Sequence, residues 1–122
     1  MLPHIHFIVG FVFGLIGIKL DLFGFWTALL IGFIAMLIDI DHLYVFYKTT
    51  GTINLKACWN QFYKGHKIYE WSFIHHWPTF IIVVLFSCVL YHYNFKWFYI
   101  IFSIYIPHFL LDHLEVWFYY KK

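Results

Sequence analysis

The sequence contains little charge. Only 11% of its 122 residues are charged, against roughly 25% in an average soluble domain. Arginine is absent, so lysine supplies every basic side chain, and the formal net charge is only +2. Hydrophobic residues make up 63% of the chain, aromatic residues 26%, and the mean hydropathy is +0.75. This composition is typical of an integral membrane protein, and we expect no nucleic-acid partner.

Cysteine is also scarce, and its placement argues against a disulfide framework. Cys58 lies in a polar connector and Cys88 in an apolar run, without the spacing of a metal motif. The residues from Met1 to His4 include no basic region, and no small-residue cleavage site follows their apolar stretch. We therefore expect a retained helix there rather than a signal peptide. The length suits a single domain, residues 1–122.

Four apolar segments predict four helices. Pro3 suits the first turn of the first helix, whereas Pro78 is expected to kink the third helix and Pro107 to interrupt the fourth. The more polar stretch from Ile53 to Tyr69 has the spacing of an amphipathic helix at the membrane interface. The predicted fold is all-α, an integral membrane four-helix bundle with this interfacial helix between its second and third helices. The predicted main helices cover residues 3–18, 22–47, 71–93 and 97–120.

The lysines predict an orientation in the membrane. With four spans, both termini and the 53–69 connector share one side. That side contains Lys48, Lys56, Lys64, Lys67, Lys121 and Lys122. The opposite turns contain only Lys19 and Lys96. Because cytoplasmic loops are enriched in basic residues, we expect both termini to be cytoplasmic, in a cell or inner membrane.

The stretch from Ile38 to His42 carries the strongest functional signal. It follows an uncharged apolar run that begins at Leu22, and it places Asp39, Asp41 and His42 within four positions. Ionisable groups at the edge of a membrane-length segment are costly unless they are paired, hydrated or bound to a cation. They are therefore functional candidates.

Acidic and histidine residues from all four predicted helices share one layer. Counting at about 1.5 Å per residue places them roughly 20 to 27 Å from the opposite turns. This layer contains His6, Asp39, His75 and Asp112. Asp39 and His42 are spaced i,i+3, and His108 and Asp112 are spaced i,i+4, so each pair shares a helical face.

These residue types predict a divalent metal site. Helical bundles build such sites from inward-facing histidines and carboxylates, and a mixed set suits zinc, or else manganese or iron. The predicted ligands are His6, Asp39, His42, His75, His108 and Asp112.

For single residues, structural roles remain open. A lone histidine such as His108 is more often a hydrogen-bonded core residue, and Asp39 alone could cap a helix or pair with Lys48. His4 and His6 point about 200° apart on a helix, and His75 and His76 about 100° apart. The sequence does not decide which member of each pair points inward.

The motifs resemble those of the YdjM-like membrane-bound metal-dependent hydrolases. His6 to Gly10 resembles the family's early His-x-x-x-Gly element. Ile38 to His42 resembles its P-D-x-D-H element with Ile in place of Pro, and His108 to Asp112 resembles its H-x-x-x-D element. The family's H-R-G-x-T-H-S element is degraded here, with Glu70 where its first histidine stands and His75 at its second. Its Arg and Thr are missing.

The resemblance implies hydrolysis, because the family is distantly similar to zinc-dependent phospholipase C. We expect a phosphoester or ester substrate of lipid or amphiphilic character, with Asp41 or Glu70 as the general base. Two alternatives stay open. One is a di-iron or haem redox enzyme, and the other is a non-catalytic metal carrier or a protein stapled by a metal.

Overall fold

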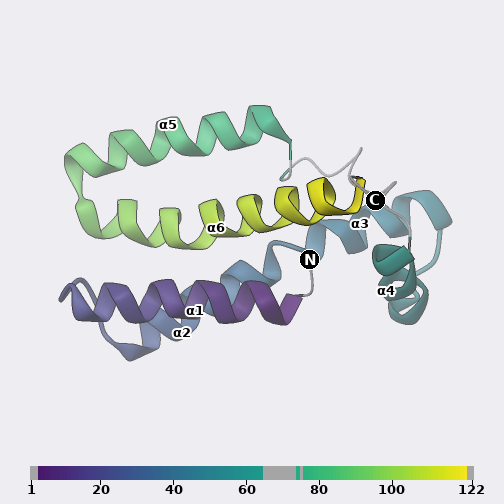
Figure 1. Ribbon diagram of the computed structural model, residues 1–122, viewed down its shortest axis with the longest axis horizontal. Coiled ribbons are helices and arrows are strands. Elements are labelled where there is room, and N and C mark those ends of the chain that lie inside the picture. Colours follow the sequence, from purple (N-terminus) through teal and green to yellow (C-terminus); the bar gives the residue numbers. More distant parts are fainter. Residues whose placement is uncertain (1–2, 65–73, 75, 121–122) are drawn as a thin grey trace.

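Every element in the described part of the chain is a helix. The computed structural model describes residues 3–64, 74 and 76–120. It contains α1 (Pro3–Lys19), α2 (Phe25–Leu37), α3 (Ile40–Thr50), α4 (Leu55–Lys64), α5 (Trp77–Tyr93) and α6 (Phe95–Tyr120) (Figure 1). The all-α prediction is confirmed.

Small residues bring α1 and α2 into close contact. A Cβ atom added to Gly10 would lie 2.8 Å from Ala35 Cβ, and one added to Gly14 would lie 2.7 Å from Ala28 Cα. Both distances are too short for any side chain, so the two backbones touch along this seam. The tight hairpin turn between the helices passes through Asp21, which has a φ of 55°.

The predicted second helix is divided in two. α2 ends at Leu37, and α3 starts at Ile40. At the break, the N–H of Asp41 donates to the Ile38 carbonyl at 3.5 Å and that of His42 to the Asp39 carbonyl at 3.1 Å. These i to i+3 bonds replace the α-helical pattern locally, a feature often found at functional positions. We call residues 38–39 the Asp39 turn.

The connector after α3 forms a shorter helix than predicted. α3 ends at Gly51, whose φ of 71° is a left-handed C-cap. α4 then covers Leu55–Lys64 of the predicted stretch from Ile53 to Tyr69, and residues 65–69 lie outside the described part of the chain. Cys58 of α4 and Phe46 of α3 are both buried, and the two helices contact each other.

Pro78 and Pro107 do not have the predicted effects on the last two helices. α5 begins at Trp77, so Pro78 lies in its first turn, where its missing N–H costs no helical hydrogen bond. The earlier start at residues 71–72 lies outside the described residues. α6 begins at Phe95 and continues through Pro107 without interruption. Such prolines are tolerated in apolar helices whose neighbours satisfy the freed carbonyl groups.

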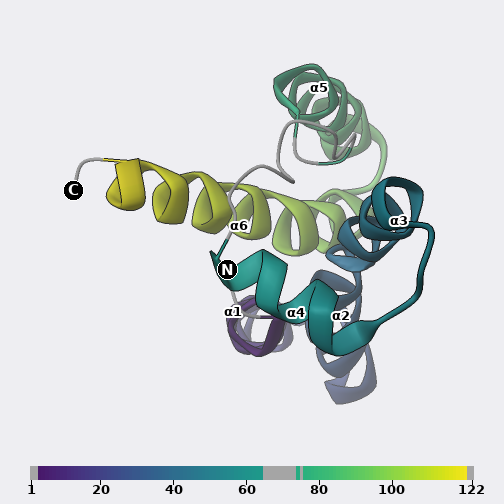
Figure 2. The same ribbon diagram turned by 90° about the vertical axis from the view of Figure 1, so that its right-hand side faces the viewer.

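α6 occupies the middle of the molecule. It packs against α1 and α2 on one side and against α5 on the other (Figures 1 and 2). The described ends of the chain and helices α3 and α4 lie toward one end of the molecule, and the α1–α2 and α5–α6 turns lie at the other (Figure 1). This arrangement brings the start of α1, the Asp39 turn and the second half of α6 together.

Two helical stretches are long and apolar enough to cross a membrane. They cover Phe25–Thr50, with a hydropathy of 1.9, and Phe95–Leu114, with a hydropathy of 1.2. The helices at His4–Lys19 and Trp77–Tyr93 are apolar but shorter. Large apolar side chains point outward on several helices, including Trp26, which is 75% exposed.

Candidate metal centre

Four side chains from distant parts of the sequence converge on one point. Each offers a nitrogen or oxygen atom that lies within 4.8 Å of the corresponding atoms of the other three. His6 comes from α1, Asp39 from the Asp39 turn, and His108 and Asp112 from one face of α6. We call His6, Asp39, His108 and Asp112 the metal cluster.

The side chains of the metal cluster lie close to one another. His6 Nε2 lies 3.1 Å from Asp112 Oδ1 and 3.7 Å from Asp39 Oδ2. His108 Nε2 lies 3.2 Å from Asp112 Oδ2 and 3.4 Å from Asp39 Oδ1. Each carboxylate thus lies with one oxygen near His6 and the other near His108, so all four groups border one small space.

A hydrogen bond fixes the orientation of the His108 ring. Its Nδ1 lies 3.0 Å from the carbonyl oxygen of Ala35. A carbonyl only accepts, so Nδ1 carries the hydrogen, and in the neutral ring Nε2 presents its lone pair to the cluster. A histidine that donates one N–H to a backbone carbonyl while its other nitrogen faces a metal is a common arrangement in metal sites.

His6 is fully enclosed, yet it is not held by hydrogen bonds. The residue is 1% exposed, and neither ring nitrogen makes a hydrogen bond of good geometry with any residue in the described part of the chain. The 3.1 Å distance to Asp112 is short, but the two groups are not aligned as donor and acceptor. His6 Nε2 is therefore a buried nitrogen close to the carboxylates of Asp39 and Asp112.

The charges in the metal cluster also fit a divalent cation. The rings of His6 and His108 lie 3.9 Å apart between centroids, so two imidazolium ions there would repel each other. Asp39 and Asp112 place two carboxylates beside these rings in a largely enclosed site. Burial of such charges is costly unless a cation compensates them. The donor set therefore fits zinc, manganese or iron.

His42 and Asp41 lie beside the metal cluster rather than in it. His42 Nε2 lies 3.7 Å from Asp39 Oδ1, and His42 Nδ1 lies 3.8 Å from Asp41 Oδ1. The predicted ligand His42 thus lies close to Asp39, a member of the metal cluster. Asp41, the predicted base, is on the far side of the His42 ring.

The structure separates the ambiguous histidines of α1. His6 is buried and belongs to the metal cluster, whereas His4 is exposed. On α6, His113 donates from Nδ1 to the Phe109 carbonyl at 2.9 Å and stacks on the Phe109 ring. Its role there is packing.

Two of the predicted site residues lie outside the described residues, namely Glu70 and His75. Their predicted roles as base and ligand stay predictions. The same holds for the choice between His75 and His76, of which only the exposed His76 is described.

The α1–α2 seam, which was not predicted, positions two members of the cluster. Contact at Gly10 brings α1 against Ala35 of α2. The carbonyl oxygen of Ala35 accepts a hydrogen bond from His108, and Asp39 follows Ala35 by about one helical turn. The sequence signal for this contact is the Gly-x-x-x-Gly spacing of Gly10 and Gly14, which favours close packing of membrane helices.

Comparison with known proteins finds no family model, no curated protein and no solved structure that matches this chain.

Proposed function

We propose that the protein is a membrane-embedded, divalent-metal-dependent hydrolase. Its substrate is a phosphoester or carboxylic ester of a lipid or amphiphile. The observation that carries this proposal is the enclosed metal cluster, because two carboxylates and two imidazoles share one small site. Such an arrangement is costly without a cation.

The proposed setting is the bilayer. The two long apolar stretches and the two shorter apolar helices would form a four-helix membrane bundle, with α4 near the interface. Both termini would be cytoplasmic, as the distribution of lysines predicts. The metal cluster would then lie near the cytoplasmic surface, within reach of lipid headgroups.

Within this site, His6, Asp39, His108 and Asp112 would hold the ion. A bound divalent ion supplies Lewis acidity toward ester or phosphoryl oxygens and lowers the pKa of water. Asp41 would accept a proton at a carboxylate oxygen, and His42, which lies between Asp41 and Asp39, would orient both carboxylates. Glu70 remains the alternative base.

The resemblance to the YdjM-like hydrolases supports the same chemistry. Three of the motif elements that resemble the family contribute the four residues of the metal cluster: His6, Asp39, His108 and Asp112. Membership in that family is part of the proposal.

The test compares ligand variants with a matched control. His108→Ala and Asp112→Ala remove ligands, and Leu110→Ala changes an exposed residue between them. We expect the purified wild type and Leu110→Ala to contain metal and to cleave members of a panel of phospholipids and carboxylic esters. The two ligand variants should lose at least about tenfold in metal affinity and lose activity.

Other outcomes separate the alternatives. Stoichiometric metal binding without cleavage of any ester would favour the non-catalytic metal carrier or the protein stapled by a metal. A visible absorption band of haem or a di-iron centre favours a redox enzyme. Full metal content and full activity in His108→Ala would show that the proposed site is wrong.

A further inference from the structure

Tyr105 supplies a buried hydroxyl that the proposed chemistry does not use. It lies on α6, about one turn before His108, and is 7% exposed. Its hydroxyl donates a hydrogen bond to the backbone carbonyl of Ile74, 31 residues earlier in the chain. A buried phenol and a buried carbonyl both need hydrogen-bond partners. This bond therefore ties α6 to a residue that comes shortly before α5.

Aromatic stacking holds the ring of Tyr105 in the same place. The ring stacks on Phe80 of α5, with centroids 6.5 Å apart, and on Phe109 of α6, at 6.1 Å. Phe80 and Phe109 also stack on each other, at 4.3 Å. Phe109 is 1% exposed and directly follows His108. The first turn of α5 is therefore packed against the turn of α6 that carries part of the metal cluster.

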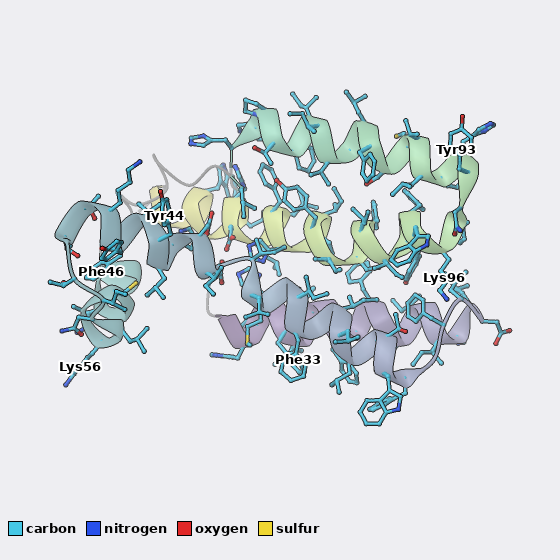
Figure 3. All side chains as sticks on the ribbon, turned by 180° about the vertical axis from the view of Figure 1, so that it is seen from behind. Phe33, Tyr44, Phe46, Lys56, Tyr93 and Lys96 are labelled. Carbon is cyan, nitrogen blue, oxygen red and sulfur yellow. The ribbon has the colours of Figure 1, made fainter. Side chains whose placement is uncertain are left out.

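The rest of α5 is held less firmly. Its main neighbour among the described helices is α6, and Ser87 is the one buried residue among those of α5 that the structure describes. Tyr93 and Lys96, at the α5–α6 turn, lie at the opposite end of the molecule from Tyr44 of α3 (Figure 3). α5 has 17 residues, so its start lies about 25 Å from this turn. The position of that start depends on its own contacts with α6.

The start of α5 borders the accessible side of the metal cluster. The side chains of His6 and Asp112 are 0% exposed, whereas that of Asp39 is 13% exposed. The candidate base Asp41, close by on α3, is 15% exposed. The negative charge of the Asp41 carboxylate acts on the Tyr105 hydroxyl, so the two groups lie near each other. The hydroxyl thus connects the start of α5 with the acidic end of α3.

We propose that Tyr105 is a positioning residue of the metal site, whose hydroxyl fixes the start of α5 beside Asp41 through the Ile74 carbonyl. Its effect on catalysis rests on the proposed function, whereas its effect on the position of α5 does not. Without the hydroxyl, the carbonyl loses this donor and the start of α5 moves away from α6. Because a misplacement of about 1 Å can cost about 10²-fold in rate, even a small movement matters.

Two matched substitutions on α6 test the proposal. Tyr105→Phe removes the hydroxyl and keeps the stacked ring. Tyr99→Phe is the control, because Tyr99 is 9% exposed and its hydroxyl also ties α6 to a backbone carbonyl, that of Phe13, at 2.9 Å. This second bond lies toward the other end of α6, away from the metal cluster. 4-Aminophenylalanine in place of Tyr105 restores a hydrogen-bond donor at the same position.

Pulsed EPR follows the start of α5 without any hydrolysis. Both native cysteines are replaced by serine, and nitroxides are attached to Ile81→Cys on α5 and Tyr44→Cys on α3, two exposed positions. We expect one separation between the labels in the wild type and in Tyr99→Phe. Tyr105→Phe should show longer and more broadly distributed separations, and 4-aminophenylalanine should restore the wild-type value.

Activity provides the second measurement. Without labels, all variants should bind as much metal as the wild type, because no ligand is changed. Ester cleavage per bound metal should fall at least about tenfold in Tyr105→Phe, stay unchanged in Tyr99→Phe, and recover with 4-aminophenylalanine. A purely structural role would lower the amount of folded protein and leave the turnover per bound metal unchanged.

Label separations in Tyr105→Phe equal to those of the wild type would overturn the inference, and so would equal turnover per bound metal. Failure of Tyr105→Phe to fold where Tyr99→Phe folds would make the bond a general stability element and overturn it as well. The proposed function can fail separately. A wild type that cleaves no ester removes the hydrolase, while the label separations still decide whether Tyr105 places the start of α5.

Discussion

At the scale of single residues, the direction of a side chain decides its role. His4 and His6 have the same chemistry and lie two positions apart on α1. Only His6 reaches Asp112 and His108, because consecutive helical residues are rotated by about 100°. His108 is oriented in turn by its hydrogen bond to the Ala35 carbonyl. The two histidines on α1 therefore provide a controlled comparison.

We predict that His6→Ala and His4→Ala differ sharply in metal content. His6→Ala removes a ligand and should weaken metal binding by at least about tenfold, because loss even of a residue that only supports a ligand costs 10- to 100-fold. His4→Ala changes an exposed side chain and should bind metal like the wild type. Elemental analysis of the purified variants after dialysis checks this. Equal metal content in the two variants would contradict the assignment of His6.

At the scale of elements, the site depends on how closely α1 and α2 pack. Gly10 faces Ala35 across the seam, and these contacts hold His6 at the height of Asp39 and His108. The Asp39 turn adds the second requirement, since its i to i+3 bonds break the helix at the position where Asp39 joins the cluster. A change in packing should therefore disturb metal binding without touching a ligand.

We predict that Gly10→Val weakens metal binding. Its side chain would begin 2.8 Å from Ala35 Cβ, so the helices must separate, at a cost of about 1–3 kcal/mol in stability. The separation moves His6 away from α6. Metal titration and unfolding in mixed micelles measure the two effects. Gly24→Ala is the control, because a Cβ at Gly24 meets nothing within 4 Å.

At the scale of the whole molecule, the metal cluster connects three parts of the chain that are far apart in sequence. It joins the start of α1, the Asp39 turn and the second half of α6, all at the same end of the molecule (Figure 1). The side chains of α5 contribute little burial, with only Ser87 buried among its described residues. Because the metal cluster joins α1, the Asp39 turn and α6, a bound ion should stabilise the fold as a whole.

We predict that metal raises the stability of the folded chain. An ion that binds only the native state at a hundred times its dissociation constant adds about 2.7 kcal/mol. Unfolding of the wild type should therefore shift to higher denaturant when zinc or manganese is added and return when it is chelated. His108→Ala should show no such shift. A shift of equal size in the variant would place the stabilising ion elsewhere.

The proposed topology predicts which turns are accessible from outside the cell. The native cysteines are poor probes, since Cys58 is buried, burial raises the pKa of its thiol, and Cys88 lies on an apolar helix. We therefore place single cysteines at Thr52 or Asn94, both exposed, after replacing Cys58 and Cys88 by serine.

An impermeant maleimide should label Asn94→Cys in intact cells and Thr52→Cys only after permeabilisation. The opposite pattern would invert the topology, and labelling of both sites in intact cells would contradict the membrane-spanning arrangement.

The sequence by itself determined the helical class and most of the metal cluster. Long apolar runs with few charges can satisfy their backbone groups only as helices in an apolar setting. The i,i+4 spacing of His108 and Asp112 and the placement of Asp39 after an uncharged run mark them as costly, and therefore as functional candidates. These inferences rest on local periodicity and on the cost of burying charge, and both can be derived from the order of residues.

Only the tertiary structure decided which partners meet. Periodicity does not fix how helices rotate against each other, so it left His6 and His4 undecided and grouped His42 with the ligands. Packing at Gly10 and Ala35 set the rotation of α1, and the local i to i+3 bonds divided the predicted second helix at Asp39.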